Sequence, residues 1–160
     1  MIHTVGMADL KVSRAKGDTL ITYSLGSCLG ITLFDPLAGV AGMLHAMLPD
    51  SGIDPRKSAQ NPFMFVDTGI PMLFRECYRL GAEKSRLIVK VAGGATSKAN
   101  VEDDYFQIGK RNFVTLRKLL WKNNVLLKAY DVGGTVARTM VIEIESGEVL
   151  LKVNGVTRNL

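Results

Sequence analysis

Cys28 is the residue of this sequence whose type and surroundings most directly suggest chemistry. It lies in the stretch "YSLGSCLGITL", between small residues and ahead of an apolar, β-branched run. A thiolate is a strong nucleophile, but a free thiol is mostly protonated at neutral pH and needs a base nearby. Four interpretations are open for Cys28: a small core residue, half of a disulfide, a metal ligand, or a nucleophile presented at a turn.

The turn that precedes Cys28 meets one requirement of a nucleophile, which is a set of backbone N–H groups to hold an oxyanion. Gly26 and Ser27 are small residues that allow a tight backbone turn, and we expect them to support an oxyanion site there. The amide of Cys28 itself could then point at a reacting carbonyl.

The base must come from one of the two histidines of the chain, His3 and His45. His3 is close to a terminus and is a poor scaffold for catalysis. His45 lies in "GMLHAMLP", and the turn-rich "FDPLAG" before it would return the chain antiparallel toward Cys28. A third residue normally orients the imidazole, and Thr22 on the strand before the turn carries a suitable hydroxyl. On spacing alone, core packing of the cysteine and the histidine stays open as the competing interpretation.

The other thiol and the histidines do not suggest a metal centre. Cys77 lies at helical spacing in "LFRECYRLG", which predicts a buried structural thiol. Neither the two cysteines nor the two histidines have metal-ligand spacing, so we expect no zinc site and no cofactor. The cysteines are also far apart in the sequence, and we expect no structural disulfide.

Two glycine pairs, Gly93-Gly94 and Gly133-Gly134, could in principle cradle phosphate. Neither has the P-loop pattern or the complete dinucleotide fingerprint, so both are interpreted as tight strand ends. Asp103-Asp104 is interpreted as negative charge at a helix N-terminus. Met43 and Met47 alternate with His45 and are predicted core residues.

Composition predicts one globular domain over residues 1–160. Hydrophobic residues make up 47% of the chain and charged residues 22%, which excludes disorder. No apolar run approaches the roughly 20 residues of a spanning helix. The N-terminal segment has no signal-peptide core, so a cytoplasmic protein without membrane insertion is expected.

The formal charge of +5 and pI of about 9.3 suit either nucleic acid or an acidic protein partner. The densest basic set follows a helical period, and no aromatic stacking residues are interleaved with it; it comprises Lys110, Arg111, Arg117, Lys118 and Lys122. This pattern favours a solvated helix face over a nucleic-acid surface.

The hydrophobic patterns predict strands and two long helices. Strands are expected at 2–12, 18–23, 30–36, 40–49, 85–95 and 125–134, with a hairpin over 138–153 that turns at 145–147. Helices are expected at 63–82, broken or kinked early by Pro71, and at 103–124; residues 50–62 are an expected exposed loop. Strands that precede and follow the helices without strict alternation predict an α+β fold with layered, mostly antiparallel or mixed sheets.

Six motifs in sequence order resemble the chemoreceptor glutamine deamidases of bacterial chemotaxis, the CheD family. They are "LGSCLGITLFDP", "AGMLHAMLP", "FVDTGIPMLF…LGA", "KVAGGA", "IGKRN" and "DVGG…R…SGEV". The resemblance implies a fold related to toxin-type deamidases and a Cys-His-Thr triad of Cys28, His45 and Thr22. It further implies hydrolysis of receptor glutamine side chains to glutamate, receptor methylesterase activity in some members, and binding to a CheC-type phosphatase in many.

The sequence departs from the family pattern at two glycine motifs. Thr96-Ser97 replaces Asn-Met after the first pair, and Ala137 replaces a glycine before Arg138. These changes bear on recognition and leave the triad untouched. Two other functions compete with the deamidase: a regulatory module that docks on the phosphatase with an idle triad, and a cysteine peptidase.

Overall fold

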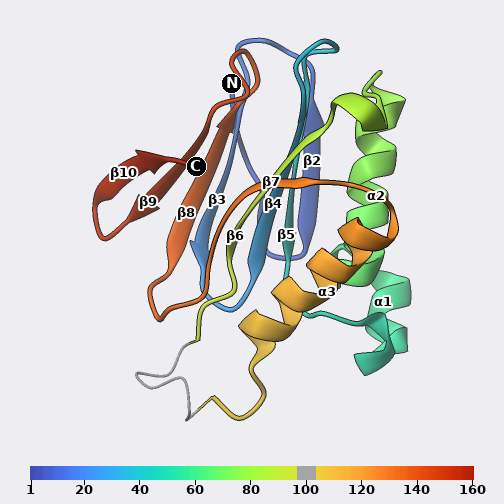
Figure 1. Ribbon diagram of the computed structural model, residues 1–160, viewed down its shortest axis with the longest axis vertical. Coiled ribbons are helices and arrows are strands. Elements are labelled where there is room, and N and C mark those ends of the chain that lie inside the picture. Colours follow the sequence, from blue (N-terminus) through green and yellow to red (C-terminus); the bar gives the residue numbers. More distant parts are fainter. Residues whose placement is uncertain (97–103) are drawn as a thin grey trace.

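The computed structural model contains two five-stranded β-sheets that face each other, and helices cover one of them (Figure 1). The structure describes residues 1–96 and 104–160. The first sheet has the order β1 (Ile2–Thr4), β3 (Thr19–Leu25), β8 (Arg138–Glu143), β9 (Val149–Val153) and β10 (Val156–Asn159). The second has the order β2 (Asp9–Ser13), β5 (Val40–Ala46), β4 (Leu29–Asp35), β6 (Ile88–Gly93) and β7 (Leu127–Val132). The helices are α1 (Pro55–Gln60), α2 (Val66–Arg79) and α3 (Ile108–Lys122).

Both sheets are mixed, as the sequence predicts. The pairs β1–β3 and β6–β7 are parallel, and the other strand pairs are antiparallel. The helices α2 and α3 lie on the outer face of the second sheet, so the layers run sheet, sheet, helices (Figure 1). The predicted layered α+β class is confirmed.

The central strands β4 and β5 are buried on both faces, and their alternating side chains divide the core in two. Leu29, Ile31 and Leu44 point toward the helices, whereas Met43 and Phe34 point toward the first sheet. Each large apolar side chain removed from water contributes about 1.5–3 kcal/mol, so both interfaces stabilise the layering.

The chain between β5 and α2 is more ordered than the predicted loop 50–62. It contains α1 and two single-turn 3₁₀ helices, Ser51–Ile53 and Pro62–Met64. The Asp54 carboxylate accepts from Lys57 N at the start of α1, and Pro55 occupies the first helical position. The Asp54-Pro55 pair thus caps a short helix.

One strand prediction was wrong, and one strand was missed. Residues 2–12 form two strands in different sheets, because the chain turns between them at Gly6 to Ala8, where Ala8 has φ of 54°. The last strand, β10, was not predicted; it is exposed along its whole length, so no alternating apolar pattern marks it. The hairpin β8–β9 is confirmed.

Both long helices are shorter than predicted. Pro71 lies inside α2, which continues through it with the proline on the exposed side. The helix α3 begins only at Ile108, because Gln107 is in the left-handed conformation and its amide N–H donates to Asp104 Oδ1 at 3.1 Å. Asp103 and Ser97 lie outside the described residues. All five basic residues named above are exposed on α3, as a solvated helix face requires.

Candidate active site

Cys28 lies at the end of the molecule where the chain passes from the first sheet to the second, one residue before β4. Its side chain is partly buried and packs against the apolar cluster between the two sheets. Burial raises the pKa of the Cys28 thiol. The backbone N–H of Cys28 interacts with the sulfur and lowers this pKa, but by less than burial raises it. Cys28 and Cys77 are both free thiols, and burial of Cys77 in the helix layer raises its pKa to about 12.

His45 returns beside this thiol on the antiparallel strand β5. Its register partner on β4 is Gly30, and Cys28 precedes Gly30 by two residues on the same face of the sheet. Diagonal neighbours of this kind have Cα atoms about 7–8 Å apart. The predicted antiparallel return from Cys28 to His45 is confirmed.

Thr22 reaches His45 from the other sheet. Its Oγ1 lies 2.7 Å from His45 Nδ1 and donates to the Val5 carbonyl oxygen at 2.7 Å. Because the hydroxyl has one proton and gives it to Val5, it must accept a proton from Nδ1. The imidazole is therefore the Nδ1–H tautomer, and its Nε2 carries the lone pair.

The imidazole is 1% exposed, and burial lowers the pKa of His45. Among the residues that the structure describes, nothing hydrogen-bonds to His45 Nε2. A buried polar atom normally has a partner. The arrangement thus presents an unprotonated nitrogen, free to accept a proton, on the face that carries Cys28.

A β-bulge follows Thr22. The register between β3 and β8 shifts between Thr22 and Leu25, and Ser24 within it has a positive φ of 56°. Such bulges re-aim a strand. Here the bulge lies between Thr22, which contacts His45, and the Gly26–Cys28 turn.

Three successive carbonyl groups anchor the Gly26–Cys28 turn to the rest of the molecule. Gly26 O accepts from Ala95 N at 2.8 Å, and Cys28 O accepts from Gly94 N at 2.9 Å. Ser27 O accepts from the Asn112 side chain at 2.9 Å. In a trans peptide the N–H points opposite to the C=O, so the amides of Ser27 and Cys28 point away from these anchors.

The glycine pairs end β6 and β7, as predicted, and both have positive φ. At Gly93 a Cβ atom would lie 2.2 Å from Cys28 O, so the glycine permits a close approach to the turn. Arg138 links the two glycine pairs, because its guanidinium donates to Gly93 O at 3.2 Å and to Gly133 O at 2.9 Å. Its charge is matched by Asp131 at 2.9 Å. Ala137, at a position where the family resemblance implies a glycine, does not have a positive φ.

Asn112 and Arg138 are two supporting residues whose roles the sequence reasoning missed, although both lie in motifs that carry the family resemblance. Asn112 is fully buried and shares one face of α3 with Gly109, Leu116 and Leu120. A polar residue in an apolar helical stripe was a signal that could have been noticed. No local pattern indicated the role of Arg138, because its partners lie on β6, on β7 and in the segment after β7.

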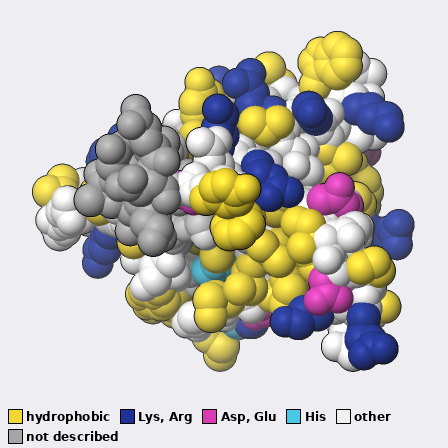
Figure 2. Space-filling model, turned by 90° about the horizontal axis from the view of Figure 1, so that it is seen from below, with side chains coloured by type: hydrophobic (Ala, Val, Ile, Leu, Met, Phe, Trp, Pro, Cys, Tyr) yellow, Lys and Arg dark blue, Asp and Glu magenta, His cyan; other side chains and the backbone are white. Residues whose placement is uncertain are grey.

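Two hollows lie near this end of the molecule, and Cys28, His45 and Thr22 line neither of them. One, of about 240 Å³, lies between the glycine pairs and the first turn of α3, and Thr96 lines it. The other, of about 310 Å³, runs between Pro49-Asp50 and the basic residues Lys110, Arg111 and Lys118. Figure 2 shows this end of the molecule, with hydrophobic side chains gathered beside Lys and Arg side chains.

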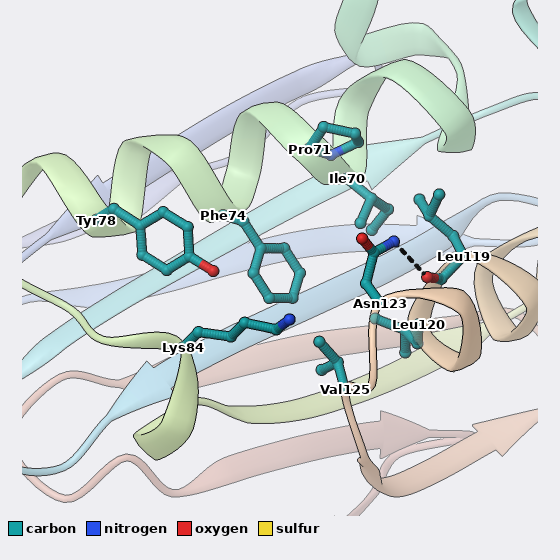
Figure 3. Close-up of a pocket in the computed structure, with 9 residues that line it drawn as sticks. All are labelled: Ile70, Pro71, Phe74, Tyr78, Lys84, Leu119, Leu120, Asn123 and Val125. Carbon is teal, nitrogen blue, oxygen red and sulfur yellow. Dashed lines mark hydrogen bonds between the residues drawn. The ribbon is translucent and has the colours of Figure 1, made fainter.

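A third hollow, of about 170 Å³, lies between α2 and α3 and has a mostly apolar lining (Figure 3). It contains neither Cys28 nor His45. In the described part of the chain, no group of three or more His, Cys, Asp or Glu residues could hold a metal ion, and no helix is long and apolar enough to cross a membrane.

Residues 47–153 match the sequence model of the family described as "CheD chemotactic sensory transduction". A Syntrophus aciditrophicus protein named "Probable chemoreceptor glutamine deamidase CheD 1" is 48% identical over 153 residues, which cover 94% of this chain and 93% of that protein. A Solibacter usitatus protein named "Probable chemoreceptor glutamine deamidase CheD" is 49% identical over 156 residues, 98% of this chain and 91% of that protein.

Among solved structures, a Neisseria meningitidis protein of the family DUF152 superposes with a TM-score of 0.48 at 8% sequence identity. The match covers 84% of this chain and 62% of the Neisseria chain.

Proposed function

The chain belongs to the CheD family, and on that premise we propose that it is a chemoreceptor glutamine deamidase. The reaction is hydrolysis of a glutamine side-chain amide on a receptor, which gives glutamate and ammonia. The proposed deamidase domain comprises residues 1–160 and acts in the cytoplasm. The names of the relatives support the substrate, and the hydrogen bond between Thr22 and His45, with Nε2 left free, is the observation that supports the chemistry.

Cys28 is the proposed nucleophile and His45 its base. His45 Nε2 takes the thiol proton, and the sulfur attacks the carbonyl carbon of the glutamine side chain to form a tetrahedral intermediate. The intermediate collapses to a thioester as the C–N bond breaks, and His45 returns the proton to the leaving ammonia. Water, deprotonated by the same nitrogen, then hydrolyses the thioester to glutamate and the free thiol.

The oxyanion of each tetrahedral intermediate rests on backbone N–H groups of the Gly26–Cys28 turn. The carbonyls of this turn are bound on the far side, which turns the amides of Ser27 and Cys28 outward. Donors fixed in this way need no reorganisation during the reaction. Thr22 acts by holding the imidazole in the tautomer that has a basic Nε2.

The proposal has two extensions. The same thioester route hydrolyses a receptor glutamate methyl ester, since only the leaving group changes from ammonia to methanol. The surface around the site also binds a CheC-type phosphatase, in line with the family resemblance. A pull-down with that phosphatase, repeated with Cys28→Ala, separates the two roles, because binding should survive while deamidation is lost.

The decisive experiment uses a purified chemoreceptor and mass spectrometry of its peptides. Wild type should convert specific glutamines to glutamate, whereas Cys28→Ala and His45→Ala should not. Cys77→Ala is the matched control, since it removes the other thiol far from the site and should retain conversion. Conversion by Cys28→Ala at the wild-type rate would refute the mechanism, and no conversion by wild type would refute the function.

A further inference from the structure

Asn112 connects the two chain segments that carry Cys28 and His45, and we propose that it is a positioning residue that fixes the spacing between the thiol and the imidazole. The role in turnover rests on the proposed function. The role in bringing the two side chains together does not, and it can be measured without any receptor.

The connection consists of two hydrogen bonds from one side-chain nitrogen. Asn112 Nδ2 donates to Ser27 O at 2.9 Å and to Met47 O at 3.1 Å. Ser27 directly precedes Cys28, and Met47 follows His45 by two residues. One side chain on α3 thereby bridges the turn of the nucleophile and the end of the strand of the base.

These bonds lie where the sheet no longer joins the two segments. The last residue pair between β4 and β5 is Leu29 with Ala46. Cys28 and Met47 lie just beyond this pair, whereas His45 lies within the paired region, opposite Gly30. Asn112 therefore supplies a lateral link at the place where the backbone ladder has ended.

The chemistry of the side chain fits this role. An amide nitrogen has two N–H groups without charge, and both acceptors here are backbone carbonyls, which fixes the orientation of the amide. The side chain is fully buried, yet Asn112 Oδ1 has no partner among the described residues. An unpaired buried acceptor lowers the stability of the fold. The favourable contribution of Asn112 therefore comes from the two hydrogen bonds that its Nδ2 donates.

The test compares Asn112→Leu with Asn123→Leu. Leucine keeps the branching of asparagine but donates no hydrogen bond. Asn123 is the matched control, because its Nδ2 also donates to a carbonyl on α3, Leu119 O at 2.8 Å, in the hollow between α2 and α3 (Figure 3). We expect Asn112→Leu to lower kcat about 100-fold with little change in KM, since a misplacement of about 1 Å has an effect of this size. Asn123→Leu should leave both constants unchanged.

A second readout needs no substrate. Iodoacetamide alkylation of Cys28 is measured against pH by peptide mass spectrometry. His45→Gln, which removes the base, should move the alkylation profile to higher pH. Asn112→Leu should move it in the same direction, and Asn123→Leu should not.

Cys77 reports on folding in the same samples, because it is fully buried and reacts only when the chain opens. If Asn112→Leu exposes Cys77, the comparison is made with Asn112→Ala, which needs no extra space and favours the helix. An Asn112 variant that keeps Cys77 protected and has the wild-type alkylation profile overturns the proposal, as does exposure of Cys77 in both variants. A shifted profile in a protein that does not deamidate receptors would support the positioning role and refute only the proposed function.

Discussion

At the scale of single residues, the structure explains how one hydroxyl prepares a histidine. The Thr22 hydroxyl donates its hydrogen bond to the Val5 carbonyl and therefore accepts one from His45 Nδ1. This fixes the basic nitrogen on the side of Cys28. In the proposed mechanism a threonine thus has the orienting role that a carboxylate has in many hydrolases, without placing a negative charge between the sheets.

Thr22→Val should lower kcat/KM about 10-fold, because the loss of one hydrogen bond of about 1–1.5 kcal/mol corresponds to roughly that factor. Valine has nearly the same shape, so packing between the sheets is kept. Thr22→Ser, which restores the hydroxyl, should return most of the activity. Steady-state kinetics on a receptor substrate check both variants, and full activity in Thr22→Val would contradict the orienting role.

The pH dependence expected for the proposed reaction follows from the burial of Cys28 and His45. Burial lowers the pKa of His45 and raises that of Cys28, so the pair rests as neutral imidazole and thiol near pH 7. As the pH falls through the pKa of His45, the protonated imidazole can no longer accept the thiol proton. The acid limb of kcat/KM should therefore have its midpoint below 6.5, the ordinary value for histidine. A midpoint above 6.5 would show that the base is a different group or a differently placed one.

At the scale of elements, the site depends on the point where β4, β5, β6 and the start of α3 converge. The sequence predicted most of these elements, but not the contacts between their ends. The Gly26–Cys28 turn is bound by a glycine loop after β6 and by a side chain from α3. Contacts between residues so far apart in the chain have no local signature, since each requires the completed fold.

Gly93→Ala tests this convergence. The added Cβ would lie 2.2 Å from Cys28 O, and the φ of +115° is itself unfavourable for alanine. We expect the free energy of unfolding in urea to fall by about 1–3 kcal/mol, with a concurrent loss of deamidation. Gly17→Ala is the control, because nothing lies within 4 Å of the Cβ added there. Equal stability and activity for both variants would be inconsistent with a close approach at Gly93.

At the scale of the whole molecule, the two sheets share the site between them. Thr22 comes from the first sheet, whereas His45 and the segment after Cys28 come from the second. The interface that buries the core between the sheets is therefore also the interface that aligns the histidine. Three basic residues of α3, Lys110, Arg111 and Lys118, line the hollow beside Pro49.

The net charge of +5 predicts a salt-dependent reaction with a receptor segment rich in glutamate and glutamine. Raising the ionic strength from about 0.05 to 0.5 M shortens the screening length severalfold, and kcat/KM should fall while kcat is largely kept. Lys118→Gln, in the hollow beside Pro49, should reduce the salt dependence of kcat/KM more than Lys16→Gln does. Lys16→Gln is the control, because it removes the same charge at a residue that does not line this hollow. A rate independent of salt in wild type would exclude electrostatic steering.

The sequence by itself determined most of the elements and the candidate residues. Periodicity located the central strands and both long helices, and "LGSC" with the single well-placed histidine nominated Cys28, His45 and Thr22. These are local features, since turn chemistry and hydrophobic alternation act between residues close in the chain.

Only the tertiary structure decided how the site is held. The split of residues 2–12 between two sheets places the Val5 carbonyl where it accepts from Thr22 and so sets the histidine tautomer. The link from Asn112 to two separated strand ends arises in the same way. Both depend on which layers pack together, because burial of apolar faces from distant segments fixes those positions, and no local pattern encodes them.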